Sequence, residues 1–303
     1  MGEKARTKRR TDPSVYLMLL PALFLLLVVS IYPFIWIFRY VLYDYNGYTA
    51  YYTGFANIKR LFTNDPIYWL SVLHTFEYSL WKIVIIIPLS LVVAVILSNQ
   101  IRGTGFFRGL YFVPTVISSA VYALIFYFIY TPYNGVLNSF LKAVGIGGGK
   151  TDWLGNPFYT MAAIVVVAIW GGLGNYMVLF IAGLTSVPAD VYESSKIDGS
   201  NKFQDFFYVT LPLLAPYIKV VLMLAITTAL SDYESIMVLT NGGPNNRSEV
   251  MFLYIYQTMF GSTSSVGSNQ IGYGALLGMM SSIIIGAVTI LFLWVSRKLD
   301  DVY

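Results

Sequence analysis

The chain has 303 residues, of which 57% are hydrophobic, 17% aromatic and only 11% charged, and its mean hydropathy is +0.66. Soluble domains carry about 25% charged residues, so this composition excludes a soluble fold. The formal net charge of +4 comes from scattered basic residues, which argues against a nucleic-acid partner. The absence of cysteine excludes disulfides and thiolate metal sites, and the single His74 argues against a histidine-ligated metal.

The N-terminal residues 1–13 form a basic tail, and an apolar stretch follows over residues 14–38. This stretch is too long for the apolar region of a signal peptide and has no small-residue cleavage site, so it predicts a retained first membrane span. Residues 39–69 are polar and rich in tyrosine, which predicts an outside loop. Its YDYNGYTAYYTGF portion fits an interfacial aromatic belt, and sugar stacking stays an alternative.

Five further apolar runs are each long enough to cross a bilayer, which takes about 20 residues. They predict an all-α polytopic membrane protein with one permease domain over residues 14–298 and a C-terminal tail at residues 299–303. The six predicted spans are residues 14–38, 70–98, 109–130, 158–184, 213–239 and 273–294.

Charged residues fall in two of these spans. His74, Glu77 and Lys82 lie at the outer end of the second, where we expect their polar groups to snorkel to the interface. Asp232 and Glu234 lie within the fifth, where a buried charge costs about 2.5–3.5 kcal/mol and favours a cavity or a substrate. A continuous helix would place these two side chains about 200° apart, so we expect at most one of them to face the pathway centrally. Such a carboxylate could accept hydrogen bonds from sugar hydroxyls or bind a cation; whether Glu77, Lys82 or Glu234 faces the pathway stays open.

The distribution of lysine and arginine predicts the orientation. With both termini inside, cytoplasmic segments hold eleven of the 19 basic residues, outside loops hold six, and two lie within spans. Cytoplasmic loops carry the excess of basic residues, so the N- and C-termini are expected in the cytoplasm. The polar segment between the fourth and fifth spans is then cytoplasmic as well.

This polar segment, YESSKIDGSNKFQDFFYVTLPLLAP, predicts a helix, a turn and a second helix. Asp190 and Glu193 favour a helix N-terminus, and Gly199 can take the positive φ that ends a helix. Apolar periodicity resumes after Lys202 and continues to Leu211-Pro212, at the entry to the next span.

The order of Glu193, two small residues, Gly199, Val209 and Leu211-Pro212 resembles the EAA loop of the membrane subunits of binding-protein-dependent ABC importers. The chain departs from that family in having two serines for alanines and a valine for isoleucine. The resemblance implies that residues 188–212 are a cytoplasmic coupling loop that docks an ATPase. It assigns ATPase coupling to Glu193, Ser194, Ser195, Asp198, Gly199, Leu211 and Pro212.

Four sequence runs point to one class within this family: RRTDPSVYLMLLPALFLLLVVSIYPF, GTGFFRGLYFVPTVIS, VPADVYESSKIDG and VLTNGGP. They look like the carbohydrate-uptake class, close to the larger permease subunit of maltose-type importers, and the similarity covers about residues 14–294. Maltose-type proteins have asparagines where this chain has Ser231-Asp232, so we expect a sugar other than maltose. The resemblance implies a sugar pathway partway across the membrane, with Tyr111, Thr115, Gly171, Gly172, Ser231 and Asp232 along it.

The resemblance further implies an ABC type I importer transmembrane fold, with alternating access, in the bacterial cytoplasmic membrane. The implied partners are a second homologous permease, two cytoplasmic P-loop ATPases, an extracytoplasmic sugar-binding protein and membrane lipid. The chain has no G-x-x-x-x-G-K-[ST] motif, so we expect no enzyme activity and no cofactor on it, with ATP and Mg²⁺ held by the ATPases.

An ion-coupled secondary transporter is the alternative, with Glu77, Lys82 or Asp232 as coupling residue. Such transporters are commonly built from internal repeats, and residues 1–150 and 151–303 show no convincing repeat. A membrane enzyme has little support, because the chain has one histidine and no cysteine.

Overall fold

A computed structural model describes residues 13–99, 102–146, 150–261 and 269–300. In this part of the chain four helices are long and apolar enough to cross a membrane, and two bent helix pairs bring the number of candidate spans to six. In chain order the elements are α1 (Pro13–Leu25), η1 (Leu26–Ile31), α2 (Tyr32–Phe38), η2 (Arg39–Leu42), β1 (Tyr43–Tyr45), β2 (Ala50–Tyr52), α3 (Ala56–Thr63), α4 (Pro66–Ser98), α5 (Thr104–Val116), α6 (Ser119–Tyr130), α7 (Val136–Ala143), α8 (Pro157–Thr185), α9 (Ala189–Ile197), α10 (Lys202–Gln204), η3 (Asp205–Thr210), α11 (Leu211–Leu213), α12 (Ala215–Leu230), α13 (Glu234–Leu239), α14 (Met251–Phe260) and α15 (Ile271–Asp300).

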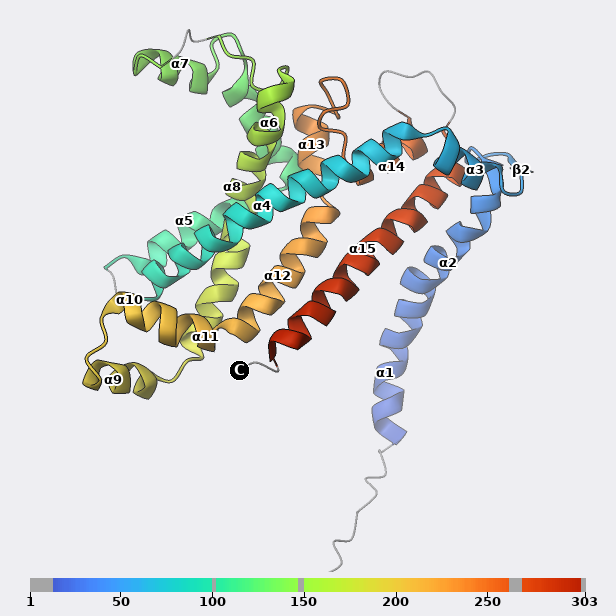
Figure 1. Cartoon of the computed structure of the whole chain (residues 1–303). Coiled ribbons are helices and arrows are strands. Elements are labelled where there is room, and N and C mark those ends of the chain that lie inside the picture. Colours follow the sequence, from blue (N-terminus) through green and yellow to red (C-terminus); the bar gives the residue numbers. More distant parts are fainter. Residues whose placement is uncertain (1–12, 100–101, 147–149, 262–268, 301–303) are drawn as a thin grey trace, which may run out of the picture.

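The first candidate span combines α1, the π-helical η1, α2 and the 3-10 turn η2. It extends to Leu42, four residues beyond the predicted end, because η2 continues the helix. No side chain in its most apolar window is buried. Figure 1 shows α1 standing apart from the other helices. The most apolar part of the first span therefore presents apolar surface on all sides, as a helix in contact with lipid would. The end of the span packs against α15, where Val41 is buried.

The predicted outside loop contains a small hairpin and α3. Strands β1 and β2 pair antiparallel, with Tyr43 opposite Tyr52. The Asn46 side chain accepts hydrogen bonds from the backbone N–H groups of Tyr48 and Thr49 at 3.0 and 2.8 Å, which closes the turn. Tyr48 is 95% exposed at the tip, so the tyrosine-rich portion is a surface feature.

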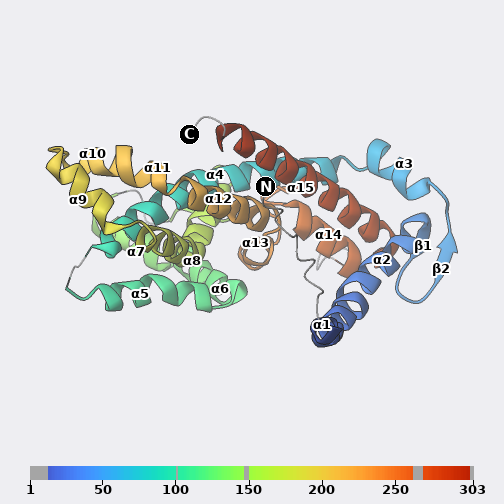
Figure 2. The ribbon, with the colours of Figure 1, turned by 90° about the horizontal axis from the view of Figure 1, so that it is seen from below.

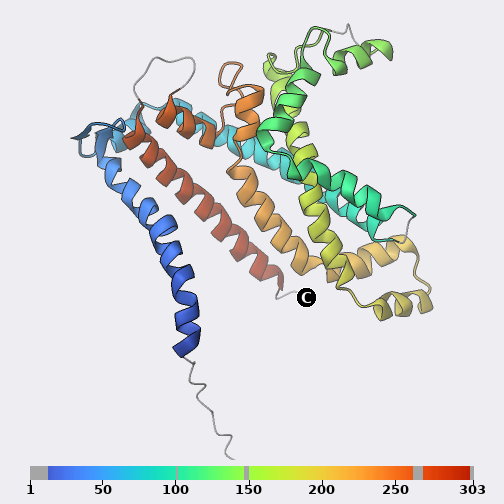
Figure 3. The same cartoon turned by 180° about the vertical axis from the view of Figure 1, so that it is seen from behind.

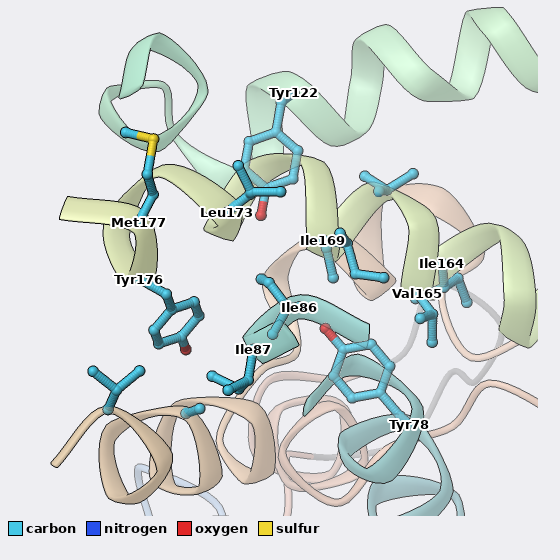
Figure 4. Close-up of a cluster of buried hydrophobic side chains, with 14 of the residues drawn as sticks. Tyr78, Ile86, Ile87, Tyr122, Ile164, Val165, Ile169, Leu173, Tyr176 and Met177 are labelled. Atoms are coloured by element: carbon cyan, nitrogen blue, oxygen red, sulfur yellow. The ribbon is translucent and has the colours of Figure 1, made fainter. Parts of the chain in front are cut away.

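Helices α4 and α8 pack against each other and bury the main apolar cluster. Tyr78 and Ile86 of α4 meet Ile164 and Met177 of α8, and all four are fully buried. Figure 4 shows the ring of Tyr122, from α6, in the same cluster. Helices in a membrane associate through close van der Waals packing, so small residues decide how near they approach.

Gly174 on α8 is where α5 comes closest. A Cβ added to Gly174 would lie 2.4 Å from the carbonyl oxygen of Tyr111 and 2.9 Å from Cγ2 of Thr115. Because a backbone carbonyl in a packed helix cannot rotate away, Gly174→Ala is expected to lower the free energy of unfolding by about 1–3 kcal/mol. The thermal unfolding midpoint of the purified chain measures this. Gly278→Ala on α15 is the matched control, since no atom lies within 4 Å of its added Cβ; equal losses in both variants would contradict close packing at Gly174.

The third predicted span, residues 109–130, is wrong as a single helix. Helices α5 and α6 meet at an angle of 98°. Ile117 and Ser118 between them have ψ values of 136° and 139°, which are extended rather than helical. Pro114 removes a backbone donor from the last turn of α5, which favours a helix end there. The third span is therefore a broken one.

The fifth predicted span, residues 213–239, is also interrupted. The helical segment Lys202–Leu213 meets α12 at an angle of 69°. Helix α12 ends at Leu230, and residues 231–233 are not helical before α13 begins. The expectation that Asp232 and Glu234 share one helix was therefore wrong, and their side chains go to different partners.

Candidate coupling loop and polar pathway

Helix α9 begins after Pro188 and is ended by Gly199, which has a φ of +80°. The N–H of Gly199 donates to the Lys196 carbonyl, and the N–H of Ser200 donates to the Ser195 carbonyl, both at 3.1 Å. These bonds satisfy carbonyl groups that the last turn of a helix leaves free. The predicted role of Gly199 in ending the first helix is confirmed.

The second helix of the loop starts at Asn201. The Asn201 side chain accepts hydrogen bonds from the N–H groups of Phe203 and Gln204, and Gln204 Oε1 accepts from the Asn201 N–H at 2.8 Å. This reciprocal capping box fixes the chain direction at the turn. Helical structure then continues through α10, η3 and α11, so the predicted order of helix, turn and helix is confirmed.

Asp205 ties the two helices together. Its Oδ1 accepts hydrogen bonds from Ser200 Oγ at 2.5 Å and from Ser195 Oγ at 2.8 Å. These two bonds, the one from Ser200 first, hold the pKa of the Asp205 carboxyl below its usual range. Ser195 is one of the two serines that replace the alanines of the EAA pattern, and its hydroxyl serves this tie. Ser194 instead bonds within α9, to the Asp190 carbonyl at 2.9 Å.

The outer surface of the loop has no covering element among the described residues. Helix α9 has no buried residue, and Ile197 and Phe203 are 86% and 79% exposed. Glu193 and Asp198 are exposed too. Figure 2 shows α9 and α10 at the edge of the molecule. An exposed helix with large apolar side chains at one end of a rigid turn is a surface that a partner protein can bind.

The end of the loop is anchored in the membrane domain. Leu211 is partly buried and packs against the main apolar cluster, whereas Pro212 is exposed. The Tyr192 hydroxyl lies 3.2 Å from Thr210 Oγ1, which joins α9 to the end of η3. These contacts join α9 to the segment that leads into α12.

A buried ion pair lies at the break between α12 and α13. Lys82 Nζ is 2.7 Å from Asp232 Oδ2, and the Tyr78 hydroxyl donates to the same oxygen at 2.5 Å. The Lys82 and Asp232 side chains are only 10% and 17% exposed. The expectation that Lys82 snorkels to the interface was therefore wrong, because a carboxylate inside the protein compensates its charge.

Two further contacts join charged residues near this break. Arg247 donates two hydrogen bonds of 2.6 Å to the two carboxylate oxygens of Glu77, whose side chain stays 33% exposed. Ser119, at the start of α6, donates to Glu234, at the start of α13. This last contact brings the breaks of the third and fifth spans together, and Figure 3 shows α6 beside α13.

Of the other predicted pathway residues, Tyr111 and Thr115 lie on α5, and Ser231 lies directly after α12. Tyr111 is 40% exposed, and the Thr115 hydroxyl donates to the Phe112 carbonyl at 2.7 Å. Ser231 is exposed, and its hydroxyl donates to the Thr227 carbonyl at 2.9 Å. Their assignment to a substrate pathway stays a prediction.

The predicted pathway glycines serve packing. A Cβ at Gly171 would lie 2.6 Å from Tyr122 Cζ, and one at Gly172 would lie 3.1 Å from Ile86 Cδ1. The ring of Tyr122 thus covers Gly171. Of the two explanations for these glycines, close approach or exposed backbone, the geometry favours close approach at both.

Tyr78 and Arg247 were not among the residues predicted from the sequence. Tyr78 precedes Lys82 by four residues on α4, so its place on the same helix face could have been found from the spacing. Arg247 gives no such signal, because its partner Glu77 is 170 residues away. Tyr176 was also missed, and its hydroxyl lies 2.9 Å from Thr228 Oγ1 between α8 and α12.

Glu249 is a buried carboxyl beneath the loop that follows α13. It is 4% exposed, and a Cβ added to Gly242 would lie 1.7 Å from its Oε2. Within the described residues its Oε1 has no hydrogen-bond partner. Burial raises the pKa of Glu249 to about 7, because the charged form loses its hydration.

This raised pKa predicts a pH-dependent stability. The folded state holds the Glu249 proton more tightly than the unfolded state. The contribution of this proton to the free energy of unfolding is therefore complete at a pH below the ordinary pKa of glutamate. The contribution is lost as pH rises towards 7, by on the order of 3 kcal/mol in total. As the pH rises from about 5 to about 8, the thermal unfolding midpoint of purified Glu249→Gln should therefore fall less than that of the wild type. Parallel curves for the two proteins would contradict the burial of a protonated Glu249.

Residues 86–301 match the family of binding-protein-dependent transport system inner membrane components. The chain belongs to this family. It is a multi-pass membrane permease subunit, and ATP hydrolysis in such systems is carried out by separate subunits.

Similar permeases cover most of the chain. The probable ABC transporter permease protein YurN of Bacillus subtilis is 31% identical over 280 residues, which are 91% of this chain and 93% of that one. The lactose transport system permease protein LacF of Rhizobium radiobacter is 30% identical, over 85% and 87% of the two chains. The multiple sugar-binding transport system permease protein MsmF of Streptococcus mutans is 33% identical over 82% of each.

The fold of the permease is that of a solved ABC importer. A chain of a bacterial ABC transporter that imports the acidic polysaccharide alginate superposes with a TM-score of 0.80. The match covers 95% of the permease and 96% of that chain, at 20% sequence identity. The predicted transmembrane-domain fold of an ABC importer is thereby confirmed.

Proposed function

We propose that the permease forms half of the translocation pathway of an ATP-driven importer for a di- or oligosaccharide. Its similarity over most of its length to permeases named for lactose and multiple-sugar transport supports a carbohydrate substrate. A second, homologous permease completes the pathway, and an extracytoplasmic binding protein delivers the sugar.

Helix α9 is the coupling element in this proposal. The geometry of α9 is the observation that supports the proposal most. The helix is exposed, ends sharply at Gly199 and is tied through Asp205 to the segment leading into α12. One of two P-loop ATPases, which hold ATP and Mg²⁺, docks on Glu193 and its neighbours. Closure of the ATPases moves α9 as a rigid piece, and α12 follows. In this proposal both termini of the permease lie in the cytoplasm.

The broken spans build the sugar pathway. Ser231 and Asp232 lie at the break that Ser119 and Glu234 share. Unwound backbone inside a membrane is tolerated where it lines a cavity, so two breaks side by side support a pathway between them. Tyr111 and Thr115 approach from α5, and the ion pair with Lys82 holds the Asp232 side chain in place.

Uptake measurements test the energy source. In cells that express the permease with its partners, collapse of the proton and sodium gradients at constant ATP should leave sugar uptake intact, and ATP depletion should abolish it. The opposite pattern would favour an ion-coupled secondary transporter. That alternative has less support, because the carboxylate best placed for ion coupling, Asp232, is already paired with Lys82.

A further inference from the structure

A cavity of about 740 Å³ lies between the C-terminal end of α6 and the loop that follows α13. Three segments line it: Tyr127, Phe128 and Tyr130 to Pro132 from the first, Asp152, Leu154 and Gly155 from the second, and Met237 to Asn241 with Gly243 and Pro244 from the third. Figure 1 shows α6 and α13 at the end of the molecule opposite α9. If α9 is cytoplasmic, as proposed above, the cavity opens on the extracytoplasmic side.

The cavity lies along the same two helices, α6 and α13, as the break shared by the third and fifth spans. Helices α6 and α13 run together from the Ser119–Glu234 contact to the cavity. Tyr127 lies eight residues beyond Ser119, about 12 Å along α6, and Val238 lies four residues beyond Glu234. A solute in the cavity is therefore one or two helical turns from the proposed pathway.

The lining has the chemistry of a saccharide site. Tyr127 and Phe128 are 46% and 63% exposed, and they offer aromatic surface to the apolar faces of a sugar ring. Among the described residues no group hydrogen-bonds to the Tyr127 hydroxyl. The Asp152 carboxylate is exposed, and within the same part of the chain it accepts one hydrogen bond, from the Gly155 N–H to Oδ1. Ligand sites typically have volumes of about 300–1,000 Å³ and combine an apolar lining with a few polar groups.

The charges along the cavity and the break indicate which class of sugar could bind. Asp152 is the charged residue among those that line the cavity. At the break, Lys82 neutralises Asp232, whereas Glu234 is bound by the neutral Ser119. The route from the cavity to the break therefore carries negative charge and would repel a uronic acid.

We propose that this cavity is an outer binding site for an uncharged saccharide, which stacks on Tyr127 and donates hydroxyl hydrogen bonds to Asp152 before it enters the pathway. The proposal rests on the sugar-import function proposed above and adds a site and a substrate class to it.

The chain has no cysteine, so single cysteines give an unambiguous chemical test. Val238→Cys places a thiol in the cavity wall, and Val136→Cys, on the exposed surface of α7, is the control. Both variants are expressed with the binding protein, the second permease and the ATPases. A membrane-impermeant maleimide is added with and without lactose, trehalose, maltotriose, arabinotriose or trigalacturonate.

The expected result is that the maleimide labels both thiols and that a neutral sugar taken up by the wild type protects Val238→Cys alone. At a sugar concentration about ten times Kd, labelling of Val238→Cys should slow about tenfold. Trigalacturonate should give no protection, and Asp152→Ala or Tyr127→Ala in the Val238→Cys background should remove the protection by the neutral sugar.

Three outcomes would overturn the inference. A Val238→Cys thiol that is unlabelled in the complex would mean that another subunit fills the cavity. A transported sugar that does not protect the Val238→Cys thiol would contradict the binding site. Protection by trigalacturonate equal to that by the neutral sugars would contradict its charge selectivity. Neither outcome would contradict sugar import. If the wild type takes up none of these sugars, the proposed function fails. The proposed site fails as well, unless one of the sugars still protects the Val238→Cys thiol from the maleimide.

Discussion

Asp232→Ala is expected to lower the free energy of unfolding of the permease by about 3–5 kcal/mol, because it leaves the Lys82 ammonium buried without a counter-charge. The Lys82 side chain is 10% exposed and reaches Asp232 at 2.7 Å. The Tyr78 hydroxyl loses its acceptor in the same variant. The thermal unfolding midpoint of the purified permease and its level in the membrane should both fall.

Two further variants separate charge from packing. In Asp232→Asn with Lys82→Met, both charges are removed and the amide oxygen still accepts from Tyr78, so most of the stability should return. Asp232→Asn alone should stay destabilised, because the buried Lys82 amine is left without a counter-charge. If Asp232→Ala unfolds at the wild-type temperature, the pair does not hold the break between α12 and α13.

Gly199→Val is expected to reduce sugar uptake on the order of tenfold, because valine at a φ of +80° costs roughly 1–2 kcal/mol or more and reshapes the turn after α9. No atom lies within 4 Å of an added Cβ, so the effect comes from the backbone and not from a clash. Uptake and sugar-stimulated ATP hydrolysis by the complete transporter measure the loss of coupling, while insertion of the permease should be unchanged.

Gly145→Val is the matched control for this variant. Gly145 has a φ of +81° after α7, and it too has no atom within 4 Å of an added Cβ. The same strain is thus placed outside the coupling loop, and uptake should stay near the wild-type rate. Equal losses in the two variants would show that the effect is general destabilisation.

The coupling loop could be predicted closely from sequence because its signals are local. Gly199 is the residue type that takes positive φ, and a Leu-Pro pair follows at the entry to the next span. The tie through Asp205 was not predicted, although Ser195 and Ser200 lie within ten residues of it. Hydrogen bonds between side chains across a turn depend on its exact geometry, which residue types alone do not give.

The membrane spans could be located, but not their interruptions. Hydropathy averages over about 20 residues and does not register the two extended residues Ile117 and Ser118, or the three non-helical residues after Leu230. The pairing of Lys82 with Asp232 was missed for a different reason, since the partners are 150 residues apart. Asp232 itself was found because a charge in an apolar segment is costly, whereas its partner was placed at the interface.

The most direct test of the central claim is to tag the permease, solubilise membranes gently and identify the proteins that copurify with it. The wild type should retain a P-loop ATPase and a second six-span permease. The Glu193→Ala, Gly199→Val double variant should retain the second permease and lose the ATPase, while Gly145→Val retains both. An ATPase retained undiminished by the double variant, or a wild-type permease that purifies alone, would contradict docking of the ATPase on α9.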